Sequence, residues 1–345
     1  MKAFKKHRDF GFFDGDIRIE KLIKLGCPLN RLSNYIDFES FRPMLTESFF
    51  TFEKGLGGRP PYDYVVMFKI LILQKYFNLS DDQVEFQIND RISFMRFLGF
   101  SFADEIPDSK TVWHFREKLT NSGITKALFD LFLSQLEGLG LVINEGKIVD
   151  ASFIETPRQR NSRQENEDIK AGIIPTAFTE KPAKLAQKDT DARWTKKNNQ
   201  CYFGYKNHIK VDSQSKIITN YEVTDASVHD SQEIVNLINQ KDKDQSLFAD
   251  SAYTGEELHK KLVEKGVHLE IHEKGARNRP LNQTQLDANK VKSKTRVRVE
   301  HVFGFMENSM NGMGMRYIGI KRIEACVGLQ NLVYNMFRKI QLQQV

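Results

Sequence analysis

The chain has 345 residues, of which 40% are hydrophobic and 28% charged, which excludes an intrinsically disordered protein and leaves room for two domains. Its formal net charge of +6 favours an anionic partner such as a phosphate backbone. Three widely spaced cysteines argue against a disulfide framework or a zinc knuckle, and lysines interrupt every apolar run before the about 20 residues of a membrane span. We therefore expect a soluble intracellular protein with no membrane partner.

Residues 41–122 have the pattern of a small helical domain, and an amino-terminal arm over residues 1–40 precedes it. Four helices are predicted: over residues 62–77, after a capping box formed by Ser80 and Gln83, over residues 91–97, and after a cap at Asp108. Short helices with tight turns are typical of DNA-binding or dimerisation domains.

The last of these helices carries basic side chains that we expect to be exposed, namely Lys110, His114 and Arg116. A basic final helix favours a helix-turn-helix-like domain that contacts DNA. A solvated face without any partner is the alternative, because charged faces most often only keep a helix soluble.

From Gly146 onward the pattern changes to strands that alternate with helices. We predict five strands, over residues 147–155, 204–211, 217–223, 246–249 and 267–272, and helices over residues 230–240, 256–265 and 295–308. This order is that of a ribonuclease H-like α/β fold with a mixed five-stranded sheet. The domain is expected to span residues 123–345, and its polar segment 158–202 is too long for a hairpin loop, which predicts an insertion after the first strand.

Three acidic residues occupy unusual places in these elements. Asp150 interrupts the first strand, where a buried carboxylate is unfavourable unless something compensates it. Asp250 directly follows the fourth strand, and α/β sheets usually hold ligands at such strand ends. Glu300 lies beside Val299 on the last helix, so we expect it to border the buried stripe instead of facing water. The three elements can bring these carboxylates together.

Clustered carboxylates are ordinarily held by divalent cations. Oxygen ligands without supporting cysteine or histidine favour Mg²⁺, with Mn²⁺ as the alternative, and two such ions can promote an in-line phosphoryl displacement. Arg296 lies four residues before Glu300, where it can contact a phosphate or pair with the carboxylate. A phosphate chain is also suited by the other basic residues of this segment, Lys292, Lys294 and Arg298.

Several motifs resemble those of a known family. The segments Leu247–Gly255 (LFADSAYTG) and Arg296–Asn308 (RVRVEHVFGFMEN) are similar to the second and third acidic motifs of bacterial insertion-sequence DDE transposases, and IVDASFIE around Asp150 is similar to the first. Ala192–Trp194 followed by Gly204–His208 resembles the insertion and second strand of the insertion-sequence-five group. The helical region is similar to the amino-terminal domain of that group.

The resemblance implies a transposase with Asp150, Asp250 and Glu300 as catalytic triad and metal ligands, and with two Mg²⁺ ions as cofactor. Its partner would be double-stranded DNA, both the terminal inverted repeats of the element and the target. Water would attack first, and the freed 3′ hydroxyl would then attack target DNA. We also expect a homodimer or higher assembly on DNA, in a bacterial cytoplasm and associated with the nucleoid.

The chain departs from this family at two positions. Many relatives carry a tyrosine seven residues before the catalytic glutamate and a lysine seven residues after it, where this chain has Ser293 and Glu307. The contacts ascribed to that tyrosine and lysine are therefore in doubt here, whereas the triad is intact.

Further contacts and alternatives follow from other residues. Backbone contacts with DNA are predicted for five more basic residues: Lys196, Lys197, Lys206, Arg158 and Arg160. His268, Glu270 and His272 alternate along the fifth strand and offer a less favoured zinc site.

Two rival functions stay open. One is a metal-dependent nuclease of the same fold that cuts without joining. The other is a non-catalytic DNA-binding derivative, which the intact triad argues against.

Overall fold

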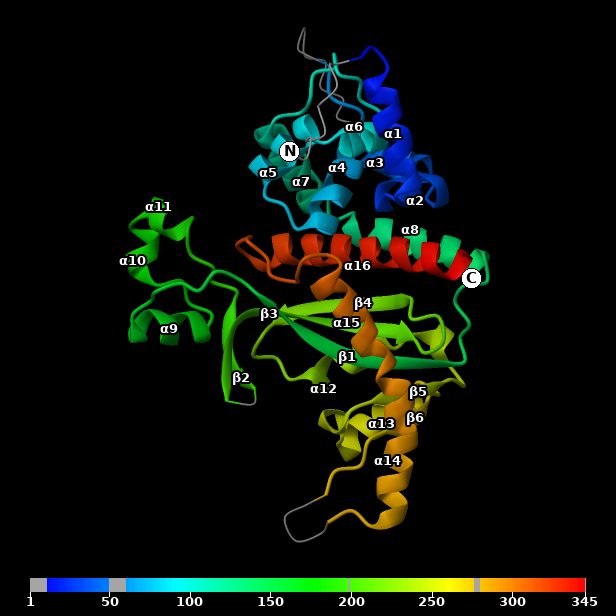
Figure 1. Ribbon diagram of the computed structural model, residues 1–345. Helices are drawn as coiled ribbons and strands as arrows, with labels where there is room; N and C mark the ends of the chain where they lie inside the picture. The colour runs from blue at the N-terminus through cyan, green and yellow to red at the C-terminus, as the bar shows by residue number, and fades with distance from the viewer. Residues whose placement is uncertain (1–10, 50–59, 198, 276–279, 345) are drawn as a thin grey trace, which may run out of the picture.

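The computed structural model describes residues 11–49, 60–197, 199–275 and 280–344. A group of helices lies above two long helices, α8 and α16, which cover one face of a mixed sheet, and further helices lie beyond the sheet (Figure 1). A small lobe, formed by α9 to α11, projects from the side (Figure 1). Within these ranges no helix combines the length and the apolar character needed to cross a membrane.

The helical region contains all four predicted helices. The capping box at Ser80 is present, and Asp108 accepts a 2.6 Å hydrogen bond from the backbone N–H of Thr111. Among the residues that the structure describes, the region has four further α-helices that we did not predict, three before the predicted set and one after it. In chain order the helices are α1 Asp14–Lys24, α2 Pro28–Tyr35, α3 Arg42–Phe49, α4 Tyr64–Phe77, α5 Asp81–Asp90, α6 Ile92–Leu98, α7 Ser109–Ser122 and α8 Thr125–Gly138.

The sheet confirms the ribonuclease H-like prediction. Strand β3 pairs antiparallel with β1 and β4, whereas β5 and β6 join on the other side of β1 as parallel strands. The strands are β1 Gly146–Glu155, β2 Arg193–Lys197, β3 Gln200–Asp212, β4 Ile218–Asp225, β5 Ser246–Ala249 and β6 His268–Ile271. We predicted five strands and the sheet has six, because β2 and the start of β3 form a hairpin inside the predicted insertion. The polar composition of β2 conceals it.

Gly204 in β3 lies where the hairpin of the insertion joins the sheet. Its φ of +143° is unfavourable for other residues, and a Cβ atom there would lie 2.2 Å from the carbonyl oxygen of Ile154. Only glycine therefore allows β3 to approach the end of β1 while it also pairs with β2.

The helices that follow the sheet strands are α12 Asp230–Leu237, α13 Glu256–Glu264, α14 Gln283–Arg296, α15 Arg298–Asn308 and α16 Ile320–Gln343. The single helix predicted over residues 295–308 is wrong at its start. The chain is already helical from Gln283, and the helix is interrupted at Val297 before it continues as α15. Short 3₁₀ turns at Phe38–Phe41, Gln240–Asp242 and Ser251–Tyr253 complete the order.

Helix α16, which we did not predict, is the most buried helix and packs against α8, β4 and α4. Gly328 permits this approach, because a Cβ atom would lie 2.4 Å from the hydroxyl of Tyr221 on β4. Asn331 pairs with Asn207 of β3, and the side-chain amide of Asn335 bonds both the N–H and the carbonyl of Ile218, at 2.9 and 2.8 Å. Polar side chains thus fix the helix on the sheet.

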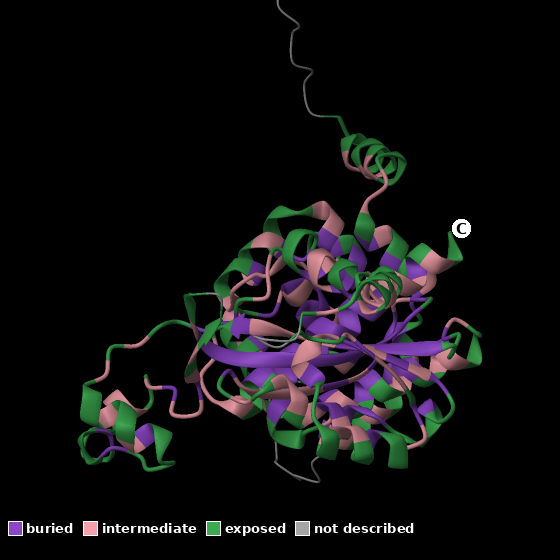
Figure 2. Cartoon of the chain, turned by 90° about the horizontal axis from the view of Figure 1, so that it is seen from below, coloured by how far each residue is buried: buried purple, intermediate pink, exposed green. Residues whose placement is uncertain are grey.

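The buried residues form two hydrophobic clusters, one on each side of the sheet (Figure 2). The larger cluster includes side chains from the helical region, α8, α15, α16 and the adjacent face of the sheet. The smaller cluster lies around Val149, α12 and α13. The projecting lobe consists of α9 Arg163–Lys170, α10 Thr176–Thr179 and α11 Pro182–Leu185.

Candidate active site

Asp150 and Asp250 lie on neighbouring parallel strands. The register pairs Gly146 with Ser246 and Ile148 with Phe248, so two further residues along each strand place Asp150 beside Asp250. Asp250 caps the turn after β5, where its carboxylate accepts a 2.7 Å hydrogen bond from the N–H of Ala252. The crossover topology therefore brings together two acids that are far apart in the chain.

Asp150 is a largely desolvated carboxyl group. Burial raises its pKa to about 6, and the charge of Asp250 acts in the same direction. The hydrogen bond from the N–H of Ala151 and the charge of Arg296 oppose this shift. The carboxylate thus has one backbone donor and a distant cation, which leaves its charge incompletely compensated.

Arg296 connects Asp150 with Glu300. Its guanidinium nitrogens lie 3.6 Å from Oδ2 of Asp150 and 3.7 Å from Oε1 of Glu300. Its Nε atom is buried and has no hydrogen-bond partner in the described part of the chain. The sequence allowed either a phosphate contact or a pair with Glu300, and the structure has the pair.

Glu300 is more exposed than we predicted, with 58% of its side chain accessible. Val299, Val302 and Met306 form the buried stripe of α15, and Glu300 lies one residue past Val299, which turns its side chain toward water. The expectation that it borders the buried stripe is therefore wrong. The guanidinium of Arg296 lies between the carboxylates of Glu300 and Asp150.

The acids are not gathered around one point. Within the described ranges, no group of three histidine, cysteine, aspartate or glutamate side chains is arranged to hold a metal ion. This finding also covers the alternative zinc site, where Glu270 lies 3.6 Å from Lys292 and His272 contacts Ser293 at 3.3 Å. The ligand roles of Asp150, Asp250 and Glu300 stay predictions.

The basic residues near Glu300 differ in availability. Lys294 is exposed, whereas Lys292 donates to the carbonyl of Ile271 at 3.0 Å. Arg298 donates to the carbonyl of Ser213 and to Gln214 in the turn between β3 and β4. Lys294 is therefore the member of this run that can bind a phosphate without first losing a protein contact.

The basic residues of the insertion and β3 also differ. Lys196, Lys197 and Arg160 are exposed, and the charge of Lys197 lowers the pKa of Asp150, which places it near the acids. Arg158 is exposed and lies over the ring of Trp194 at 5.7 Å. Lys206 is 8% exposed and pairs with Asp230 at 2.8 Å, so its ammonium serves a contact inside the protein.

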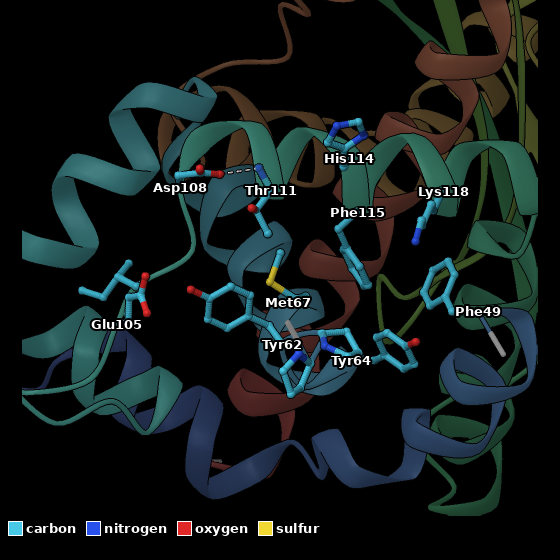
Figure 3. A pocket seen from close by; sticks show the side chains of 13 residues that line it. Phe49, Tyr62, Tyr64, Met67, Glu105, Asp108, Thr111, His114, Phe115 and Lys118 are labelled. Atoms are coloured by element: carbon cyan, nitrogen blue, oxygen red, sulfur yellow. Dashed lines mark hydrogen bonds between the residues drawn. The ribbon is translucent and has the colours of Figure 1, made fainter. Parts of the chain in front are cut away.

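In the helical region, Lys110 and His114 are exposed on α7 as predicted, but Arg116 is buried. Arg116 lies four residues after the buried Val112 and forms two hydrogen bonds with Asp81, at 2.5 and 2.8 Å. The expectation that Arg116 is exposed is wrong, because its charge is satisfied internally. His114 borders a pocket of about 320 Å³ with an aromatic lining that includes Tyr62 (Figure 3).

Tyr253 is a site residue to which our sequence reasoning gave no role. It is 1% exposed, and its hydroxyl has no hydrogen-bond partner among the residues described. Burial and the nearby charges of Asp150, Asp230 and Asp250 raise its pKa well above the ordinary value. Its place three residues after Asp250 in the second acidic motif was the available signal.

Comparison with known families decides the assignment. Residues 144–336 match the family described as "Transposase DDE domain", and residues 17–118 match "Transposase domain (DUF772)". The chain belongs to the DDE transposase family. The predicted family is confirmed, whereas membership of the insertion-sequence-five group stays a prediction.

Among solved structures, this transposase is similar to one titled "Cryo-EM structure of piggyBac transposase synaptic complex with hairpin DNA (SNHP)". The two chains are 13% identical with a TM-score of 0.46, and the match covers 91% of this chain and 75% of the other.

Proposed function

We propose that this transposase binds the ends of its insertion sequence as double-stranded DNA, cuts them, and joins the freed 3′ ends to target DNA. Asp150, Asp250 and Glu300 would hold two Mg²⁺ ions, with Mn²⁺ as a substitute, in an assembly of two or more copies on DNA. The observation that carries the proposal is the junction at Arg296, which contacts Asp150 and Glu300 while the strand register sets Asp250 beside Asp150.

The side chains at this junction suit divalent cations. The candidate donors are carboxylate oxygens, and the desolvated Asp150 has a raised pKa that nearby positive charge would lower again. Bound ions of this kind supply activation of the attacking oxygen and stabilisation of the leaving oxygen in a phosphoryl displacement. To reach the same ions, Glu300 must part from Arg296, which frees that guanidinium for a DNA phosphate.

The exposed cations around the junction support DNA as the substrate. Lys294, Lys196 and Lys197 are accessible and would bind the phosphate backbone on either side of the acids. They orient the duplex, whereas the acids select the bond that is cut.

The proposal is tested with a duplex that contains the DNA flanking the gene, end-labelled and incubated with Mg²⁺. Asp250→Asn and Glu300→Gln should each reduce cleavage more than about 100-fold, because the loss of a metal ligand disturbs a metal site more than the loss of a nearby charge that does not bind the metal. Glu307→Gln is the matched control, since Glu307 is an exposed glutamate on the same helix. Binding of the uncut duplex should be nearly unchanged in all three variants.

Two results would contradict the proposal. Cleavage at the wild-type rate by Asp250→Asn or Glu300→Gln removes the triad assignment. Hydrolysis without any joined product, when target DNA is present, favours the metal-dependent nuclease instead.

A further inference from the structure

A pocket lined by several cationic side chains lies away from the acids, between the helical region and the loop that joins α15 to α16. Its volume is about 240 Å³. Lys75 on α4, Trp113 and Arg116 on α7, and Arg316 and Tyr317 in the loop line it. Since a water molecule occupies about 30 Å³ in the liquid, the pocket has room for a phosphate group together with bridging waters.

Lys75 lacks the partners that a lysine in this position needs. Its ammonium lies 3.7 Å from the sulfur of Met315 and 4.7 Å from the ring centre of Tyr317, and it also interacts with the thiol of Cys326. Over the ranges that the structure describes, no oxygen atom accepts a hydrogen bond from it. An ammonium group has three donors, and two sulfur atoms and a ring face satisfy them poorly. An anionic oxygen in the pocket would accept a hydrogen bond from this ammonium group.

The remaining charges of the pocket leave it positive. Arg116 is neutralised by its paired contact with Asp81 and also lies over the ring of Tyr317 at 4.7 Å. Arg316 is exposed and has no ion pair within the described part of the chain. Asp81 also lines the pocket, but neither Lys75 nor Arg316 forms an ion pair in the described ranges, and Trp113, with 42% of its surface exposed, provides an aromatic wall.

The pocket lies within reach of a duplex bound at the acids. The N–H of Met315 donates a 2.9 Å hydrogen bond to the carbonyl of Glu155, which ties the loop to the end of β1. Glu155 follows Asp150 by five residues, about 17 Å along a strand. That length corresponds to about five base pairs of rise along DNA.

We infer that this pocket binds a phosphate group through Lys75 and Arg316, and that the phosphate belongs to the backbone of the DNA whose end lies at the acids. The choice of DNA as the source rests on the proposed function. The phosphate chemistry does not, because it follows from the side chains of the pocket.

The test uses the full-length protein and compares Lys75→Met and Arg316→Gln with the wild type. Methionine has a similar length, favours helices and suits the thioether and aromatic surroundings, so Lys75→Met should keep the melting temperature. Arg316 is exposed, so Arg316→Gln also keeps the fold. Lys261→Met, which removes an exposed lysine on α13, is the matched control.

Fluorescence anisotropy with a labelled duplex measures the dissociation constant across salt concentrations. Each pocket variant should weaken binding and reduce the slope of log affinity against log salt by about one, whereas the control keeps the wild-type slope. Inorganic phosphate forms the second arm, in which a melting-temperature increase seen in the wild type should be lost in Lys75→Met.

The outcomes separate the claims. A reduced slope supports a DNA phosphate, and a phosphate-dependent shift with unchanged slopes supports a free phosphate instead. Wild-type behaviour of both pocket variants in both arms overturns the inference. If the wild type binds no duplex, the proposed function fails, and the inorganic phosphate arm alone decides whether the pocket binds phosphate.

Discussion

Arg296 lies between two of the three candidate metal ligands. One guanidinium lies against both Asp150 and Glu300, at distances longer than a hydrogen bond. Such contacts reduce the repulsion between the carboxylates but do not replace the water that Asp150 has lost. We therefore expect the acids at this junction to lower the stability of the protein, as is common at active sites.

The charge of Asp150 should destabilise the metal-free protein. We expect Asp150→Asn to raise the free energy of unfolding by about 1 to 3 kcal/mol in the presence of a chelator, because asparagine keeps the acceptor for Ala151 and removes a poorly compensated buried charge. Urea denaturation at neutral pH measures this difference. A lower unfolding free energy in the variant would mean that Arg296 stabilises the carboxylate fully.

At the scale of elements, the strands that carry the acids could be predicted, and the residues around them could not. Asp150 interrupts an apolar strand sequence and Asp250 directly follows one, which are local signals, and the predicted bounds of β5 match the observed ones. The exposure of Glu300 and the burial of Arg116 depend on partners distant in sequence. Asp81, for example, lies 35 residues before Arg116.

Helix α16 is the clearest element that sequence reasoning missed. Its buried set includes Gln330, Asn331 and Asn335, so the helix has no simple apolar stripe. Asn331 and Asn335 can be buried because β3 and β4 supply their hydrogen-bond partners, whereas Gln330 donates to the carbonyl of Gly312. Periodicity along one segment cannot reveal partners more than 100 residues away.

The amide of Asn335 should be a strong contributor to stability. Asn335→Ala leaves the N–H and carbonyl of Ile218 buried without partners, and we expect the free energy of unfolding to fall by about 2 to 4 kcal/mol. Chemical denaturation measures the loss. Asn308→Ala, at an exposed position on α15, is the control and should change stability by less than about 0.5 kcal/mol. An equal effect of the two variants would contradict this role.

His208 on β3 should make the fold sensitive to acid. The hydroxyl of Thr224 donates to the carbonyl of Asp225 and therefore accepts from Nε2 of His208, while the buried Nδ1 has no partner in the described part of the chain, which suits the neutral ring. Burial lowers its pKa to about 4. Because the folded-state pKa lies below the unfolded value of about 6.5, this stability is complete above pH 6.5 and is lost as the pH falls toward 4, by about 3 kcal/mol.

His208→Gln should remove that part of the pH dependence. Unfolding free energies of the variant and the wild type, measured between pH 4 and 7.5, should differ in slope over this window, and the comparison cancels the contributions of other groups. His268→Gln, at an exposed position, should keep the wild-type slope. Parallel curves for His208→Gln and the wild type would refute the assignment.

At the scale of the molecule, one hydrophobic cluster crosses the boundary that we predicted near residue 122. Side chains of the helical region, α8 and α16 pack in the same cluster as Ile209 and Tyr221 of the sheet. Phe129 of α8 meets Tyr221 with ring centres 5.0 Å apart. The two parts of the chain therefore share buried surface, and the domain boundaries stay predictions.

A shared core predicts one cooperative unfolding transition. The chain has two tryptophans, Trp113 on α7 in the helical region and Trp194 on β2 in the sheet. Trp194→Phe and Trp113→Phe each leave one reporter, and their fluorescence transitions in urea should have the same midpoint within error once the stability of each variant is measured by circular dichroism. Separate midpoints would show that the helical region unfolds independently.

The bond between Asn335 and Ile218 also blocks one position at the edge of the sheet. A border strand with unsatisfied backbone groups is a template on which a second chain can add, and this is a common route to aggregates. At Ile218 the side-chain amide occupies both groups that an incoming strand would use, and α16 covers the position. A helix whose polar residues conceal it in the sequence thereby closes this position of β4 to the addition of another strand.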